Sequence, residues 1–161
     1  MIFFTADLHL GHANIIRHCN RPFESAVEMD ATLIDNINEI VGEDDELWVL
    51  GDFAWRDHGR YQNWLSVRNL HFLAGNHDSK QLNLPNTEHR VFNKVRFHLS
   101  HYPHVSWRGS NHGSIHLYGH CHGTMEKTLN TIWPDRKSMD VGVDCNGYKP
   151  VSLDQILKRF A

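Results

Sequence analysis

The stretch Ile2-Phe3-Phe4-Thr5-Ala6-Asp7-Leu8-His9 decides the fold. A short apolar run is followed at once by two polar side chains, Asp7 and His9, and such a run predicts a buried strand. In layered α/β proteins, ligands bind beyond the carboxyl ends of the strands. The stretch therefore predicts an α/β fold with a polar site that begins at Asp7.

Further predicted strands also end in clusters of Gly, His, Asp or Asn. These strands are Glu46–Leu50, Asn69–Ala74, Val95–Ser100 and Ile115–Tyr118, and the clusters after them are Gly51-Asp52, Gly75-Asn76-His77-Asp78, His101 and Gly119-His120-Cys121-His122. The glycines are expected to let the backbone turn sharply. In D-x-H and H-x-H, an extended backbone would place both side chains on one side. Each cluster alone fits a turn, but their repetition at successive strand ends predicts one shared site.

The rest of the chain predicts two capped helices, a shorter helix and one more strand. Ser25 and Glu28 fit a capping box, and apolar residues at helical spacing extend that helix to Val41, with Gly42 ending it. A second box, Ser152 to Gln155, opens a C-terminal helix. A short helix is expected within Arg60–Arg68, one bent or two separate strands within Val91–Ser100, and a last strand at Met139–Val143. Residues 104–113 and 123–137 read as long loops, which are often functional.

Composition describes an ordinary globular chain that is rich in histidine. The 161 residues fit a single domain, 1–161, and a net charge of −3 without like-charge blocks gives no footprint for nucleic acid. There are 14 His against 16 Lys plus Arg, which favours a metal site. Three Cys without a C-x-x-C motif suit a reducing cytoplasm. No apolar run is long enough to cross a membrane, and the start of the chain lacks the features of a signal peptide.

The side-chain types in the clusters narrow the choice of metal. They combine carboxylate, imidazole and carboxamide without a required thiolate. Such nitrogen and oxygen sites suit Mn, Fe, Zn, Ni or Co better than Ca or Mg alone. The sequence therefore predicts a divalent transition-metal site.

The order D-x-H, G-D, G-N-H-D, H, G-H-x-H resembles the calcineurin-like metallophosphoesterase superfamily, over nearly the whole chain. Longer stretches are similar to a compact branch found in bacteria and their phages. They are 6–16 (ADLHLGHANII), 19–23 (CNRPF), 50–53 (LGDF), 99–103 (LSHYP) and 140–144 (DVGVD).

The resemblance implies a four-layer α/β/β/α sandwich with two divalent metals, Mn most of all, at the carboxyl ends of its strands. The first metal would be held by Asp7, His9, Asp52 and His122, and the second by Asp52, Asn76, His101 and His120. Asp52 would bridge the two ions, and His77 would stand beside the scissile phosphate. The implied reaction is in-line attack of a metal-bridging hydroxide on a small phosphoester or nucleotide-type substrate.

The sequence differs from one branch of this superfamily at a position close to Asp52. The protein Ser/Thr phosphatase branch has a second Asp three residues after the G-D aspartate, where this chain has Trp55. This argues against a protein phosphatase and leaves Asp78 and Asp57 as candidates for an acidic partner of His77. The short chain has no room for a large capping domain, so an open site is expected, which slightly favours diesters over monoesters.

Several other residues are candidates for contacts around the site. His12, Arg17 and Arg21 could bind substrate, since phosphate needs donors besides metals and Arg offers a bidentate fork. Asp144 could orient a ligating histidine. In the loop after His101, the residues that could grip a base or sugar are His104, Trp107, Arg108 and His112.

Two other functions fit parts of this pattern. A non-catalytic metal-binding scaffold of the same fold tends to lose the G-N-H histidine or several ligands, and here they are all present. A metalloenzyme with other chemistry, such as an amide hydrolase or an oxygenase, is disfavoured by the missing H-x-H-x-D-H and H-x-D patterns. The favoured prediction is a metal-dependent phosphoesterase.

Overall fold

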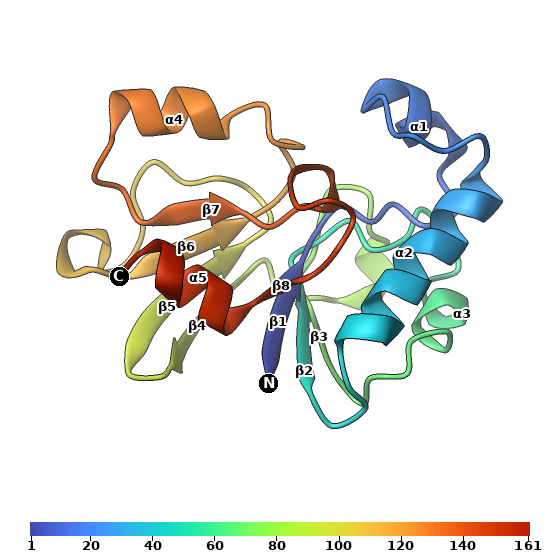
Figure 1. Cartoon of the computed structure of the whole chain (residues 1–161), viewed down its shortest axis with the longest axis horizontal. Helices are drawn as coiled ribbons and strands as arrows, with labels where there is room; N and C mark the ends of the chain where they lie inside the picture. The colour runs from blue at the N-terminus through green and yellow to red at the C-terminus, as the bar shows by residue number, and fades with distance from the viewer.

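A computed structural model describes all of residues 1–161 and contains two four-stranded sheets (Figure 1). The first has the order β3 (Asn69–Phe72), β2 (Glu46–Val49), β1 (Ile2–Thr5) and β8 (Val151–Ser152). The second has the order β4 (Thr87–Phe92), β5 (Val95–Ser100), β6 (Ile115–Tyr118) and β7 (Ser138–Asp140). Strands β1, β2 and β3 are parallel, as are β5, β6 and β7, so their carboxyl ends meet at one edge of each sheet.

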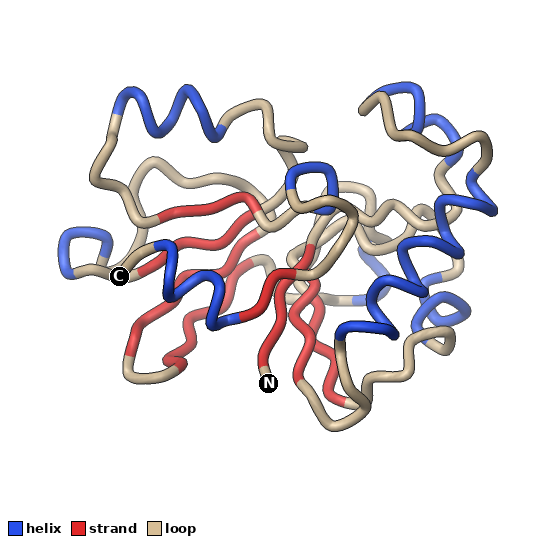
Figure 2. Tube along the Cα trace, in the orientation of Figure 1, coloured by secondary structure: helices blue, strands red, loops and turns tan.

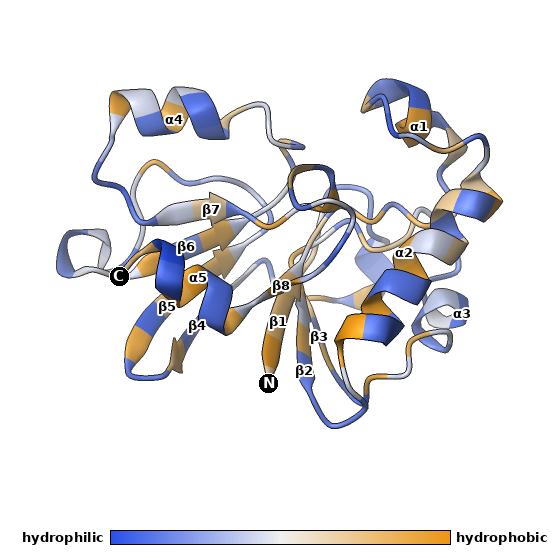
Figure 3. Ribbon diagram, in the orientation of Figure 1, coloured by the Kyte–Doolittle hydropathy of each residue, from blue (hydrophilic) through white to orange (hydrophobic).

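Alternating side chains of the first sheet build two separate cores. Phe3 and Leu47 point into one core, whereas their neighbours Phe4 and Trp48 point into the other. The second core lies between the sheets, where the ring of Phe4 stacks on that of Phe97 in β5 at 6.2 Å. Figure 3 shows apolar residues along β1 and on the side of helix α2 (Ala26–Ile40) that faces the first sheet. The sheets therefore pack face to face, which confirms the predicted α/β sandwich.

Helices flank the two sheets, as Figure 2 shows. They are α1 (Ala13–His18), α2 (Ala26–Ile40), α3 (His58–Gln62), α4 (Glu126–Ile132) and α5 (Leu153–Arg159). The predicted Ser25 cap opens α2, where its hydroxyl accepts from the amide of Glu28, while the Glu28 carboxylate reaches the amide of Glu24 instead of Ser25. The full capping box forms at α5. No helix has the length and apolar character needed to cross a lipid bilayer.

Some strands and helices differ in their bounds from the predicted elements. The segment Val91–Ser100 contributes to two strands, and β4 begins earlier, at Thr87. The last predicted strand ends at Asp140, because Val143–Cys145 turn into a 3-10 helix. The helices α1 and α4 form within segments read as motif and loop, and α2 ends at Ile40, just before Val41 becomes extended.

A network of histidines links β5, β6 and the loop between them. Nδ1 of His116 lies 3.1 Å from the His98 carbonyl oxygen, and Nε2 of His116 accepts a hydrogen bond from the His104 amide at 3.0 Å. Nε2 of His98 lies 3.0 Å from Nδ1 of His104. Because His116 uses one ring nitrogen as an acceptor, it must be neutral. Burial lowers the pKa of His116 to about 3, and burial with the neighbouring His104 and His89 lowers the pKa of His98 to about 4.

We expect this network to make the fold sensitive to acid. The folded-state pKa values lie below the ordinary value of 6.5, so unfolded chains bind more protons, and stability is lost as the pH falls from about 6.5 toward 4. Each neutral histidine contributes a slope of up to about 1.4 kcal/mol per pH unit. Urea unfolding of chelator-treated protein should show that the free energy of unfolding falls less between pH 7 and pH 5 for His116→Gln than for the wild type. Equal losses would contradict the assignment.

Candidate metal centre

The loops after the parallel strands carry the predicted polar clusters to one place. The loop after β1 runs beside that after β2, because the amides of Asp7 and His9 donate to the carbonyls of Gly51 and Asp52 at 3.1 and 2.9 Å. The second sheet joins through the amide of His120, which donates to both carboxylate oxygens of Asp7 at 3.0 and 2.8 Å. The junction of the two sheets thus forms the floor of the site.

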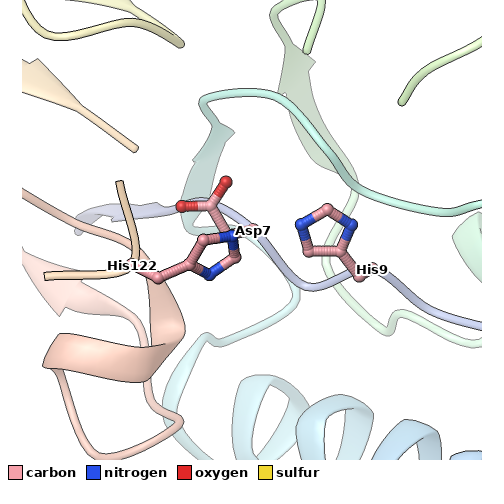
Figure 4. A group of neighbouring side chains, drawn as sticks. All are labelled: Asp7, His9 and His122. Carbon is pink, nitrogen blue, oxygen red and sulfur yellow. The ribbon is translucent and has the colours of Figure 1, made fainter. Parts of the chain in front are cut away.

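The first group of candidate ligands is Asp7, His9 and His122. One ligand atom from each lies within 4.8 Å of the others, and the two imidazole rings are 5.4 Å apart. Figure 4 shows Asp7 and His9 on one segment and His122 reaching them from a separate one. These are three of the four residues that the sequence analysis expects around the first metal, and the fourth is Asp52.

A second group, Asp52, His101 and His120, also has ligand atoms within 4.8 Å of one another. Asn76 completes it, since its side-chain oxygen lies 3.0 Å from Nε2 of His101. Asp52 Oδ2 lies 3.5 Å from Nε2 of His9 and 3.4 Å from Nε2 of His101, and so stands between the two groups. One carboxylate oxygen of Asp52 therefore lies within 3.5 Å of a histidine from each group.

The chemistry of these residues fits a pair of divalent cations. His9 is 1% exposed, and neither of its ring nitrogens has a hydrogen-bond partner, which is costly unless a ligand satisfies them. Burial lowers the pKa of His9 to about 3, so the ring is neutral, as metal coordination requires. Burial also raises the pKa of the Asp7 carboxyl to about 7, and the neighbouring His101 and His122 offset only part of this rise. Two cations would satisfy both groups.

Hydrogen bonds orient the ring of His101 and favour the ionised form of the Asp52 carboxyl. The Nδ1 of His101 donates to the Leu50 carbonyl at 2.9 Å, which leaves Nε2 free to face Asp52. Burial favours a raised pKa for Asp52, but the hydrogen bond and charge of His101 and the amide of His77 outweigh it and lower the pKa to about 2. The Asp52 carboxylate is therefore charged at neutral pH.

Five candidate ligands adopt a left-handed backbone, with φ between 47° and 69°. They are Asp7, His9, Asp52, His120 and His122. Such conformations cost roughly 1–3 kcal/mol each for residues other than glycine, and they cluster at functional sites. The D-x-H and H-x-H segments are therefore not extended, so the condition under which their two side chains would share a side is not met.

The glycines after the strands serve two different purposes. Gly51 has a φ of +92°, as the predicted sharp turn requires. Gly75 and Gly119 have no positive φ, and their role is close approach, because a Cβ at Gly119 would lie 2.7 Å from Oδ2 of Asp7. At Gly119, the expected reason for the glycine was wrong, since the missing side chain makes room for a candidate ligand.

Neither proposed acidic partner hydrogen-bonds to the ring of His77. The Asp78 carboxylate instead accepts from the amides of Asp52, Phe53 and Gly75 at 2.8 to 3.1 Å, and so ties the ends of β2 and β3 together. Asp57 is the residue before α3, and its side chain forms no capping hydrogen bond with that helix. The His77 ring instead lies 5.2 Å from that of Trp55, and Trp55 stacks on His12 at 4.2 Å.

Arg21 lies beneath the site and not in it, contrary to the expectation that it binds substrate. Its side chain is 0% exposed and donates to the carbonyls of Asp7 and Leu8 at 2.6 and 2.9 Å. Two further bonds of 2.8 Å bind it to the Asp144 carboxylate. With its donors satisfied by protein groups, Arg21 joins the backbone of Asp7 and Leu8 to the carboxylate of Asp144 beneath the first group of candidate ligands.

The predicted role of Asp144 as an orienting acceptor is supported by its geometry. Its Oδ2 lies 2.7 Å from Nδ1 of His122, so that the other ring nitrogen can face the first group. We expect Asp144→Asn to weaken metal binding about 10–100-fold. Equilibrium dialysis with Mn²⁺ checks this, with the exposed Asp35→Asn as the control. Wild-type affinity in Asp144→Asn would contradict the role.

A cavity of about 830 Å³ opens over the candidate ligands. One wall consists of Asp52, Asn76, His77, His120 and His122, and the other of His12, Asn14, Ile15, Arg17 and His18. His12 and Arg17 thus line the cavity, as expected of substrate contacts. Asn14 and His18 were missed, because the sequence did not indicate α1, the helix that presents them.

The loop after His101 contributes little to this cavity. Trp107 is buried, with its indole NH donating to the Ser114 carbonyl, and His104 faces His98. Arg108 and His112 do not line the cavity. These four residues therefore do not line the cavity over the candidate ligands.

The fold and the ligand groups together define a metal-binding α/β sandwich, and sequence comparison gives the family. Residues 1–154 match the sequence model of the calcineurin-like phosphoesterase family. An uncharacterized protein of Methanocaldococcus jannaschii is 37% identical over 98% of this chain and 89% of its own. The chain belongs to the calcineurin-like phosphoesterase family.

More distant similarities extend over the full length. The gene 66 protein of Mycobacterium phage L5 is 28% identical, over 96% of this chain and 91% of its own. A solved structure of a protein of unknown function from Aquifex aeolicus superposes with a TM-score of 0.80 at 22% identity, covering 99% of this chain and 98% of that one. The latter likeness concerns the fold alone.

Proposed function

We propose that this protein hydrolyses phosphoric esters, diesters in preference to monoesters, with two divalent metal ions bridged by Asp52. The observation that carries the proposal is the place of Asp52 Oδ2, 3.5 Å from Nε2 of His9 and 3.4 Å from Nε2 of His101. Asp7, His9 and His122 would complete the first ion's ligands, and Asn76, His101 and His120 the second's. When bound, such a metal pair supplies an activated water and offsets the charge of the phosphoryl oxygens.

The histidines outside the ligand sets would act on the ester itself. The rings of His77 and His12 are 5.8 Å apart in the same cavity, and His77 is 5.1 Å from His9. We assign His77 to the leaving oxygen or the developing phosphoryl charge, where an imidazole can transfer a proton or donate a hydrogen bond. His12 would be a substrate contact, held in orientation by Trp55.

The preference for diesters rests on the size of the cavity. A volume of about 830 Å³ is at the upper end of ordinary ligand pockets and leaves space on both sides of a phosphoryl group. A monoester fills only one side. The nitrogen and oxygen donors suit Mn, Fe, Zn, Ni or Co, and the proposed metal is manganese, which the family resemblance favours. A reducing cytoplasm suits the three free cysteines.

The function is tested with bis-p-nitrophenyl phosphate and p-nitrophenyl phosphate. Metal-free protein receives Mn²⁺, Fe²⁺, Zn²⁺, Ni²⁺ or Co²⁺, one at a time, and release of nitrophenolate is followed. We expect turnover with Mn²⁺ and a higher kcat/KM for the diester. A folded protein that binds metal but hydrolyses neither ester would indicate a scaffold, and faster monoester cleavage would overturn the diester preference.

A further inference from the structure

The second wall of the cavity has chemistry that the metal side does not explain. Asn14, Arg17 and His18 lie on one face of α1, since positions three and four apart are neighbours on a helix. Ile15 is buried in the first core and reaches the cavity only with the little of its surface that remains exposed. All three polar residues are exposed and line the cavity. The short helix thus presents a row of hydrogen-bond donors across from the candidate ligands.

Arg17 has no protein partner for its charge. It forms neither an ion pair nor a side-chain hydrogen bond, whereas Arg21, the next arginine along the chain, is held by Asp144. Of the residues that line the cavity, the only carboxylate is Asp52, which is a candidate metal ligand. An unpaired guanidinium that faces a cavity without free carboxylates favours an anion, and phosphate suits its fork of donors.

The cavity is too large and too polar for one phosphate with an apolar group. Ile15 is the one hydrophobic residue among those that line its volume of about 830 Å³. Typical ligand pockets are mostly apolar, with a few polar groups that fix orientation. Here the proportions are reversed, which is expected when the ligand itself carries charge at more than one point.

We propose that the substrate carries a second phosphate group, bound by Arg17 with His18 and Asn14, while the scissile phosphate lies at the metal side. This rests on the proposed function only for the place of the scissile phosphate. The substrate class is therefore a nucleotide-type phosphoester with at least two phosphates, such as a nucleoside bisphosphate or a 5′-phosphorylated strand end.

Binding to the Mn²⁺-loaded His77→Ala variant, which is expected to keep its metal and lose turnover, tests the proposal without hydrolysis of the ligands, and the arginine variants are made in the same background. Thymidine 5′-monophosphate and thymidine 3′,5′-bisphosphate share one nucleoside and differ in one phosphate. Titration calorimetry should show that the bisphosphate binds about tenfold or more tightly, the gain expected from one charged hydrogen-bonded pair. The gain should shrink toward unity in Arg17→Ala and with rising salt, and persist in Arg96→Ala, an exposed arginine near the other end of β5.

A second pair of ligands identifies the source of the extra phosphate. The dinucleotides dTpdT and pdTpdT share the same diester and differ in the terminal phosphate. A gain for pdTpdT alone indicates a strand end, and a gain for the bisphosphate alone indicates a free nucleotide. No gain in either pair, or a gain that Arg17→Ala leaves intact, would overturn the proposal. Turnover of bis-p-nitrophenyl phosphate by the wild-type protein, measured alongside, shows separately whether the proposed hydrolase function holds.

Discussion

Asp52→Asn is expected to lower kcat/KM for bis-p-nitrophenyl phosphate by at least about 10³-fold, because the bridge contributes several kcal/mol through both ions. Asparagine keeps Oδ1, which accepts from the His77 amide at 2.8 Å, so the loop after β3 should stay in place. It loses the charge and the second carboxylate oxygen, which stands between His9 and His101. Steady-state kinetics and metal content, measured on the same preparation, check the prediction.

The control for this variant is Asp35→Asn, which removes an exposed carboxylate from α2. It should keep both the activity and the metal content of the wild type. If Asp52→Asn retained two ions per chain and stayed within about tenfold of wild-type activity, the assignment of Asp52 as the bridge would be wrong.

His77→Ala is expected to lower turnover about 10²–10⁴-fold while leaving the metal content intact. The alternative role is that of a ligand, since His9, Asp52 and His77 also have ligand atoms within 4.8 Å of one another. The two roles predict opposite results for bound metal. A proton donor or hydrogen-bond donor to the ester affects kcat, whereas a lost ligand also lowers the affinity for Mn²⁺.

Calorimetric titration of Mn²⁺ into metal-free His77→Ala therefore decides between the roles. The matched control is His112→Ala, which removes an exposed histidine outside the cavity. Loss of metal from His77→Ala but not from His112→Ala would make His77 a ligand and would remove it from the chemistry assigned to it.

The strands that carry the site were predictable because their signal is local. The apolar run Ile2–Thr5 and the polar pair after it are adjacent in sequence, and parallel strands bring such ends to one edge whatever the loops between them do. In contrast, β8 has two residues and exists because it pairs with β1, which lies at the opposite end of the sequence. No periodicity marks so short a strand.

The misread positions in the site depend on long-range contacts. Arg21 follows the first motif closely and so read as a substrate contact, but its burial comes from Asp144, 123 positions further on. The close approach of Gly119 to Asp7 joins the two sheets, so the sequence around Gly119 could suggest only a turn. The left-handed backbone of the ligands falls on Asp and His, which adopt it more often than most residue types, but the sequence does not mark which of them will do so.

The central claim is most directly tested by titrating metal-free protein with Mn²⁺ while following hydrolysis of bis-p-nitrophenyl phosphate. A centre bridged by Asp52 predicts that activity rises until two ions are bound per chain and then reaches a plateau. Full activity with one ion per chain, or two bound ions with no hydrolysis, would contradict the account.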